Sequence, residues 1–406
     1  MKKIVIIEPG SSALYIANAV KHLGYEPVIL CSINEYSGEP KYALQKQGYY
    51  EVNAKSVDAI LQCIEENKID DIFGVISTAD RFIVQACEVA RKLDVNGMDP
   101  ALLKLNNKAD VVRFIPEHSP STLVFNKDAI PFSQLKDLLG MSGAIVVKPA
   151  SSAGAKGLFE VKTEEEIDCL IDFMKKEKQA DVIDKDWLAQ PVINGTLYSL
   201  EGFVVNGQVR YIGLSRRSRI KYTESQNHFP AENETQDSIY SELTAVLEKL
   251  VNVSGYKRGY FHSEILYDGQ KAYLIDANFG RVGGGSIALQ IAKSTGKSIE
   301  DVYAHVLETT FFPERLSHST FYPKEKIKTL SILYGVEQAS TFVELSLADI
   351  TLCMHVQIAE KGKELKPVGM DNRSWIGFLI GTPDEVLREI NLISIITDKG
   401  ALKPVF

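Results

Sequence analysis

Residues 259–278 read Gly-Tyr-Phe-His-Ser-Glu-Ile-Leu-Tyr-Asp-Gly-Gln-Lys-Ala-Tyr-Leu-Ile-Asp-Ala-Asn. Asp268 and Gly269 stand between two apolar runs, a pattern typical of a β-hairpin. Because alternate side chains of a strand point to the same side, Asp276 and Asn278 should share one face of the second strand. The stretch therefore predicts a hairpin that carries acidic and amide side chains among apolar neighbours.

The position of Glu264 relative to Asp276 depends on the length of the hairpin loop. A strict two-residue loop would place Glu264 opposite Tyr273 and turn it away from Asp276. An odd loop, such as residues 268–270, or a β-bulge would bring Glu264 to the face of Asp276 and Asn278, and we predict one of these two. Buried carboxylates need a partner or a metal, and two carboxylates with an amide oxygen suit Mg²⁺. The alternative is a surface hairpin with scattered polar residues.

Two further patterns flank the hairpin in the sequence. Upstream, Lys148 ends an apolar run and leads into the small-residue loop 150–157, which predicts a phosphate site because backbone N–H groups can approach anionic oxygens there. Downstream, Arg281 precedes three glycines at 283–285, and a helix expected over 287–292 would point its N-terminus at the same place. Arg281 could stabilise a transferring phosphoryl group or an oxyanion. A flexible hairpin loop and a surface arginine are the alternatives.

Composition excludes several classes of protein. The 406-residue chain has a net charge of −8, which argues against nucleic acid as the main partner. The cysteine count is five, and none share a CxxC spacing, so we expect free thiols in a reducing cytoplasm. No apolar run approaches the roughly 18 residues of a membrane span, so no membrane partner is expected.

The order of expected elements predicts three parts. Strands at 4–7, 27–30 and 72–76 alternate with helices at 11–23, 57–66 and 81–93, which favours a parallel α/β sheet. After about residue 116 the strands are separated by glycine-rich turns, as in antiparallel α+β structure. We therefore expect an N-terminal α/β domain over 1–115, a small subdomain over 116–192 and a large subdomain over 193–406, with a C-terminal extension from about 312.

Taken together and in this order, the motifs resemble the ATP-grasp superfamily over roughly residues 1–310. Residues 259–264 and 276–285 are similar to the branch of carboxylate–amine ligases that contains the dipeptide-forming L-amino-acid ligases. The resemblance implies an ATP-grasp fold: an N-terminal parallel α/β (pre-ATP-grasp) domain, a central small lid subdomain and a C-terminal antiparallel α+β domain. It also implies an ADP-forming enzyme that uses ATP and Mg²⁺, or Mn²⁺, to join a carboxylate to an amine through an acyl-phosphate.

The resemblance assigns roles to residues at matching positions. Residues expected to contact the ATP phosphates, directly or as the loop that closes over them, are Lys108, Lys148, Ser151, Ser152 and Gly154. Residues expected around the adenine are Gln190, Pro191, Val192 and Leu266. The metal would be held by Glu264, Asp276 and Asn278, and Arg281 would act on the acyl-phosphate.

The chain departs from the family pattern at three positions. The hinge begins with Gln190 where Glu is usual, and Asp276 stands where Glu is commoner. Leu197 occupies the position that usually supplies a carboxylate to the ribose, with Glu201, of the same strand parity, as a substitute about two pleats away.

Other polar positions keep two interpretations each. The basic run 215–221 is either a clamp for anions or a solvated strand end. His262 either orients substrate or is a packed side chain. Asp80 is either a helix cap, which we expect, or a ligand.

Rival functions stay open at this point. A carboxylase that activates bicarbonate and a non-catalytic ATP-binding regulator both fit the motifs, and a NAD-dependent oxidoreductase is disfavoured because GxGxxG is absent after the first strand. The expected partners are a small-molecule carboxylate and a small-molecule amine, and the resemblance leaves a homodimer open.

Overall fold

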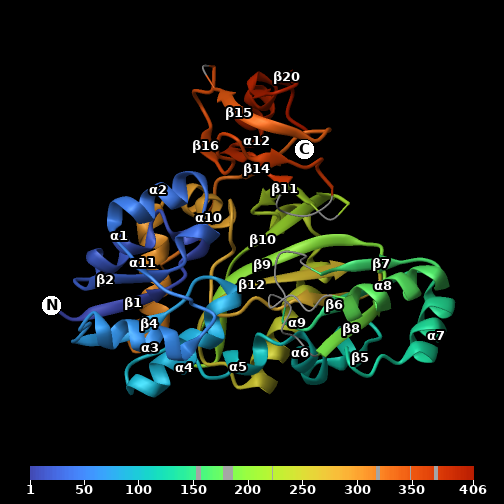
Figure 1. The fold of residues 1–406 in the computed structure, drawn as a ribbon, viewed down its shortest axis with the longest axis horizontal. Helices are drawn as coiled ribbons and strands as arrows, with labels where there is room; N and C mark the ends of the chain where they lie inside the picture. The colour runs from blue at the N-terminus through green and yellow to red at the C-terminus, as the bar shows by residue number, and fades with distance from the viewer. Residues whose placement is uncertain (152–156, 177–185, 222, 317–320, 348, 370–373) are drawn as a thin grey trace.

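The computed structural model describes residues 1–406 except 152–156, 177–185, 222, 317–320, 348 and 370–373. Figure 1 shows a blue N-terminal part on one side, a teal and green small part on the other, a green and yellow central sheet between them, and an orange and red C-terminal part above. The mixture of a parallel sheet with antiparallel sheets confirms the predicted fold class.

The N-terminal part contains a four-stranded parallel sheet in the order β3-β2-β1-β4, as the alternating pattern predicted. Residues 4–7 of β1 are fully buried, because helices cover both faces of such a sheet. The predicted helix from Ser11 begins only at Ile16, since Gly10, with φ of +59°, starts a short 3₁₀ turn. The strands are β1 (Lys3–Ile7), β2 (Glu26–Cys31), β3 (Tyr50–Glu51) and β4 (Ile72–Ile76). The helices and turns are η1 (Gly10–Ser12), α1 (Ile16–His22), η2 (Ile33–Glu35), α2 (Gly38–Gln47), α3 (Val57–Glu66), η3 (Asp80–Phe82), α4 (Ile83–Leu93), α5 (Leu102–Leu105), α6 (Lys108–Phe114) and η4 (Pro116–His118).

The small part is a four-stranded antiparallel sheet in the order β5-β8-β6-β7, with two helices packed on it. Trp187 is 2% exposed in its core. The strands are β5 (Leu123–Asn126), β6 (Ile145–Pro149), β7 (Phe159–Val161) and β8 (Asp186–Pro191), and the helices are α7 (Phe132–Ser142) and α8 (Glu164–Lys176). β8 leads directly into the central sheet, so Gln190 and Pro191 lie at the junction between the two parts.

The central sheet has eight strands in the order β13-β12-β9-β10-β11-β14-β18-β16, all paired antiparallel. Its strands are β9 (Thr196–Val205), β10 (Gln208–Ile220), β11 (Thr223–Phe229), β12 (Arg258–Tyr267), β13 (Ala272–Asp276), β14 (Thr329–Tyr334), β16 (Met354–Gln357) and β18 (Gly377–Gly381). Its helices and turns are η5 (Glu232–Glu234), α9 (Asp237–Ser254), α10 (Ile287–Thr295), α11 (Ile299–Phe311) and η6 (Pro313–Leu316). Helix α11 packs against both α1 and β12, which joins the N-terminal part to the central sheet.

The C-terminal residues extend this sheet, because β14, β18 and β16 continue it beyond β11. A second sheet, in the order β17-β15-β19-β20, packs beside them around a separate apolar cluster. Its elements are β15 (Ser340–Ser346), β17 (Glu364–Leu365), β19 (Ser394–Thr397), β20 (Gly400–Leu402), α12 (Pro383–Glu389) and η8 (Ile390–Leu392). The end of the chain is thus joined by backbone hydrogen bonds to the strands that carry the hairpin motif.

All five cysteines are free thiols. No helix in the part of the chain that the structure describes is long and apolar enough to cross a membrane.

Candidate active site

The β12–β13 hairpin brings Glu264 directly opposite Asp276. Glu264 pairs with Asp276 while Ile265 pairs with Leu274, so Ile275 is the extra residue of a β-bulge. The loop itself has four residues, 268–271, because Tyr267 pairs with Ala272. The prediction of an odd loop is therefore wrong, and the alternative prediction of a bulge is confirmed.

Asn278 follows the bulge in a left-handed conformation, with φ of +46°, which asparagine tolerates better than most residues. Its carbonyl accepts a hydrogen bond from the His262 N–H at 3.0 Å. The chain after β13 is thereby tied back to β12, and Asn278 lines the same cavity as Glu264 and Asp276.

This cavity, of about 560 Å³, is called the central cavity below. The N-terminal part contributes Ser11 and residues 78–81 to it, the small part Lys148 and Leu158, and the C-terminal part Leu333 and Trp375. The central sheet and the segment after β13 contribute the acidic and basic side chains Arg217, Arg219, Glu224, His262, Glu264, Asp276 and Arg281. All four regions of the fold meet here.

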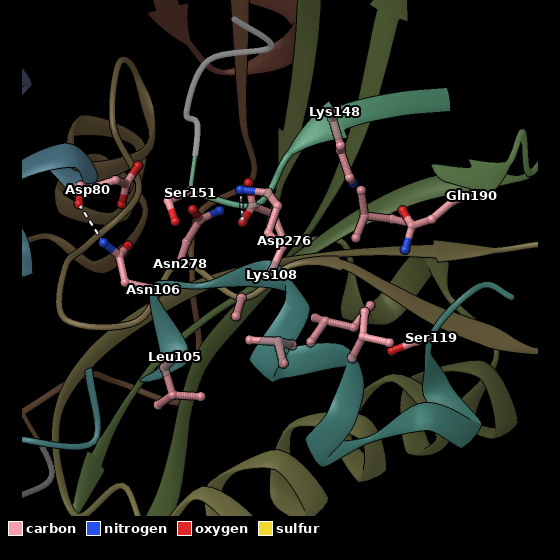
Figure 2. Close-up of a pocket in the computed structure, with 15 residues that line it drawn as sticks. Asp80, Leu105, Asn106, Lys108, Ser119, Lys148, Ser151, Gln190, Asp276 and Asn278 are labelled. Carbon is pink, nitrogen blue, oxygen red and sulfur yellow. Dashed lines mark hydrogen bonds and ion pairs between the residues drawn. The ribbon is translucent and has the colours of Figure 1, made fainter. Parts of the chain in front are cut away.

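A second, smaller cavity adjoins the central cavity beside the β8 hinge, and we call it the hinge cavity (Figure 2). Both cavities share Lys108, Lys148, Asp276 and Asn278. Ser151, Gln190 and Leu274 line the hinge cavity. In Figure 2 the side chains of Lys148 and Gln190 lie on the side of the small sheet, and Lys108 reaches Asp276 from helix α6.

Two lysines predicted for phosphate contact lie where the two cavities meet. Lys108 begins α6, where Asn107 caps the helix by accepting from the N–H groups of Ala109 and Asp110, and its Nζ lies 3.4 Å from Asp276 Oδ1. Lys148 is 8% exposed at the end of β6. Burial, and then the neighbouring charge of Lys108, lowers the pKa of Lys148 to about 8. Adding an anion at this place would relieve the repulsion between the two ammonium groups.

Both oxygens of Glu264 are bound by arginines. Arg217 donates from Nη1 to Oε1 at 2.5 Å, and Arg219 donates from Nη2 to Oε2 at 2.8 Å. Burial opposes the ionised form of Glu264, but these guanidinium groups and His262 hold its pKa well below its usual range. Arg217 is itself held by Glu224, with contacts of 3.1 Å and 2.5 Å.

The basic run 215–221 therefore divides by strand parity. Arg217 and Arg219 point into the central cavity, whereas Arg216 is exposed on the opposite face, 3.9 Å from Glu234. The solvated-face interpretation fits Arg216, whereas a clamp for anions formed by Arg217 and Arg219 stays a prediction, since both donate to Glu264.

Arg281 forms a bidentate ion pair with Asp80. Its Nε donates to Oδ1 and its Nη2 donates to Oδ2, at 2.6 Å for the second contact. Its Nη1 also donates to the Val282 carbonyl at 3.1 Å. The prediction that Asp80 caps a helix is wrong, because Ala79 is the N-cap residue of η3 and makes no side-chain cap. Of the five N–H donors of a guanidinium, three are used to fix Arg281, and two are left for a ligand.

His262 is both packed and at the cavity. It is 3% exposed, lines the central cavity, and its Nδ1 lies 2.5 Å from Glu201 Oε1. Burial alone would lower the pKa of His262, but the Glu201 carboxylate raises it to about 9. Glu201 is fully buried and also accepts from the Ser199 hydroxyl, so its proposed use as a ribose ligand is not supported.

The three glycines at 283–285 have different surroundings. A Cβ on Gly283 would lie 2.5 Å from Ile287 and 2.9 Å from His262 Nδ1, so this position is required by packing. Gly284 and Gly285 line the central cavity, as expected for a backbone that approaches a ligand.

The remaining expected residues are placed as follows. Ser152 and Gly154 lie outside the described residues. Gln190 is 7% exposed and donates to the Thr122 hydroxyl at 2.9 Å. Leu266 is half-buried opposite Leu197 and lines neither of the two cavities, so its adenine contact stays a prediction, as do those of Pro191 and Val192.

Among the cavity residues that sequence reasoning missed, two come from the C-terminal part of the chain. Leu333 and Trp375 come from the region after residue 312, and the Trp375 Nε1–H donates to the Glu224 carbonyl at 2.8 Å. A tryptophan in a weakly patterned segment was the available signal. Placing this tryptophan at the cavity required knowing that β14 pairs with β11 and so joins the C-terminal part to the central sheet.

The donor set fits a hard divalent cation. Glu264 and Asp276 are adjacent across the hairpin, and Asn278 lines the same cavity. Within the described ranges no three His, Cys, Asp or Glu side chains gather into a metal site. Two carboxylates and one amide oxygen would occupy part of the coordination shell of the cation and would leave its other positions for phosphate oxygens.

Comparisons with known proteins agree with this geometry. Residues 141–288 match the ATP-grasp domain family. Among solved structures, the L-amino acid ligase from Bacillus licheniformis superposes with a TM-score of 0.75 at 16% identity, covering 96% of this chain and 95% of that one. Phosphoribosylglycinamide synthetase from Anaerococcus prevotii gives 0.68 at 17% identity, covering 97% and 99%. Biotin carboxylase from Campylobacter jejuni gives 0.69 at 14% identity, covering 99% and 93%. These likenesses show a shared fold. No curated protein sequence matches the chain.

Proposed function

We propose that this protein is an ATP-dependent ligase that activates a carboxylate as an acyl-phosphate and joins it to an amine, and the match of residues 141–288 to the ATP-grasp domain family supports this. The observation that carries the proposal is the meeting of Lys108, Lys148, Arg281 and the hairpin carboxylates at one cavity. ADP and phosphate are the expected products beside the amide.

The nucleotide is proposed to lie with its base at the β8 hinge and its phosphates between Lys108 and Lys148. Gln190 lies at the hinge cavity, and its amide oxygen is the atom left to accept from the base, since its Nε2 already donates to Thr122. Lys108 lies 3.4 Å from Asp276, and Lys148 lines the same two cavities, which supports placing the terminal phosphate near the hairpin. The loop Ser151–Lys156, predicted to close over the phosphates, lies outside the described residues apart from Ser151.

Glu264, Asp276 and Asn278 would hold Mg²⁺, or Mn²⁺, which when bound neutralises the charge on the transferring phosphoryl group. Lys108 and Lys148 would share in neutralising that charge. Little covalent chemistry falls to the protein in phosphoryl transfer, so these residues act by position and charge.

The carboxylate substrate attacks the γ-phosphorus of ATP, and ADP leaves. An amine then attacks the carbonyl carbon of the acyl-phosphate, the tetrahedral intermediate collapses, and phosphate leaves while the amine loses a proton. Arg281 is suited to the oxyanion of that intermediate because Asp80 and the Val282 carbonyl fix its plane and leave two donors available. An amino acid is the proposed carboxylate substrate, by likeness to the Bacillus licheniformis enzyme.

The test is ADP and phosphate release over a matrix of paired amino acids and carboxylic acids, with product masses measured. Arg216→Gln, on the face away from the cavity, should keep the wild-type rate, and Glu264→Gln should lose it. AMP and pyrophosphate as products would refute the mechanism. ADP release that needs bicarbonate and no carboxylic acid would identify a carboxylase instead, and nucleotide binding without turnover would identify a regulator.

A further inference from the structure

Glu264 is neutralised by cations before any metal is bound. Its two oxygens accept from Arg217 and Arg219 at 2.5 Å and 2.8 Å, and its side chain is only 16% exposed. Mg²⁺ coordinates carboxylate oxygens at about 2.0–2.1 Å. A metal and two guanidinium groups would therefore compete for the same pair of oxygens.

The two arginines differ in how firmly they are held. The Arg217 side chain is 5% exposed and makes a two-contact ion pair with Glu224 in addition to Glu264. The Arg219 side chain is 34% exposed, follows the irregularity in strand pairing after Ser218, and has Glu264 as its ion-pair partner. Arg217 would keep a carboxylate partner if Glu264 turned to a metal, whereas Arg219 would lose its own.

The place of Arg219 at the central cavity determines what its side chain could bind once a metal occupies Glu264. Its side chain borders the central cavity together with Lys148 and Arg281. A divalent cation bound to Glu264 would repel the Arg219 guanidinium toward the open part of that cavity. An uncompensated guanidinium there would attract an anion, and its planar donors match a carboxylate.

We propose that Arg219 is a counter-ion of Glu264 that is displaced when the metal-bound nucleotide arrives and then binds the carboxylate of the second substrate. This inference rests on the proposed function and adds an order to it, with nucleotide and metal binding before the carboxylate. Arg219 is thus a substrate-binding residue whose partner changes from Glu264 to the carboxylate.

The first measurement is Mn²⁺ binding to the full-length protein without nucleotide, followed by the electron paramagnetic resonance signal of free Mn²⁺. Arg219→Gln should bind Mn²⁺ at least about tenfold more tightly than wild type because a competing charge is gone. Arg219→Lys should stay near wild type. The matched control is Arg216→Gln, which removes the same charge from the exposed face of β10.

Equal Mn²⁺ affinity in wild type and Arg219→Gln would overturn the proposal, and so would an equal gain in Arg216→Gln. The second measurement uses the carboxylate substrate found in the ADP-release matrix. Arg219→Gln should raise the KM for that carboxylate at least about tenfold while the KM for ATP does not rise. An unchanged carboxylate KM would overturn the second half of the proposal. If the matrix shows no turnover, the proposed function fails, while the Mn²⁺ titration still decides whether Arg219 screens Glu264.

Discussion

The Asp80–Arg281 pair gives the sharpest test of the active-site assignment. Asp80→Asn keeps the size of the side chain but removes its charge and turns one of the two acceptors into a donor that opposes Arg281 Nη2. Loss of a partner from a buried ion pair costs about 3–5 kcal/mol. Because the Asp80 side chain is 21% exposed and that of Arg281 11%, solvent would replace part of the interaction, and we expect about 2–3 kcal/mol.

This loss should appear in the rate of reaction, since Asp80 fixes the plane of the guanidinium. At about 1.4 kcal/mol per factor of ten, kcat/KM for the carboxylate should fall roughly 30- to 150-fold, with nucleotide affinity unchanged. The assay is steady-state ADP release by wild type, Asp80→Asn, Arg281→Gln and the double variant. Asp58→Asn is the matched control, because its carboxylate pairs with Lys92 at 2.9 Å and is 87% exposed.

The double variant decides between a shared and a separate role. If Asp80 acts by holding Arg281, the double variant should be no slower than Arg281→Gln alone, which gives a large coupling energy. Losses that multiply in the double variant would show that the two residues act independently and would refute the reasoning.

Three further outcomes follow from the site. The affinity of the wild type for nucleotide should fall as pH rises through about 8, because Lys148 loses its charge there. The Lys148→Met variant should bind nucleotide more weakly, and its affinity should not depend on pH. Both are measured by titration with a fluorescent nucleotide between pH 7 and 9. Deletion of Ile275 should preserve Mn²⁺ binding, because Asp276 would then follow Leu274 directly and still pair with Glu264 on the same face; loss of binding in a variant with an unchanged circular dichroism spectrum would contradict the bulge argument. The Glu201–His262 pair should contribute its full stability below about pH 6.5, and this contribution should be lost as pH rises through about 9, where folded His262 deprotonates. Urea unfolding of Glu201→Gln over the same range should show a flatter dependence on pH than wild type.

The hairpin shows how far the sequence alone could reach. Alternation of side chains required either an odd loop or a bulge to bring Glu264 to Asp276, and this requirement was correct. Which of the two occurs depends on how β12 pairs with β9 and on the Asp268 carboxylate, which accepts from the N–H groups of Gln270 and Lys271 at 2.8 Å. These contacts depend on the pairing of neighbouring strands and on the conformation of the loop. The alternation of side chains within the hairpin sequence carries little information about either.

Contacts between distant segments were beyond sequence reasoning for the same physical reason. Asp80 and Arg281 are 201 residues apart, and Arg217 reaches Glu264 across the sheet from β10. An isolated aspartate after a strand fits a helix cap as well as an ion pair. Lys148 and Lys108, by contrast, each stand beside a recognisable local motif, which is why their place could be anticipated.

The continuity of the eight-stranded sheet limits how the protein could accept larger substrates. Glu264 on β12 and Leu333 on β14 are four strand positions apart, and every intervening pair of strands is joined by backbone hydrogen bonds. At about 4.8 Å per strand, the two positions are held roughly 19 Å apart along the sheet. The acidic end and the apolar end of the central cavity therefore cannot separate unless strands part. Variants selected for longer substrates should shorten Leu333 or Trp375, since the length of the cavity is set by the backbone.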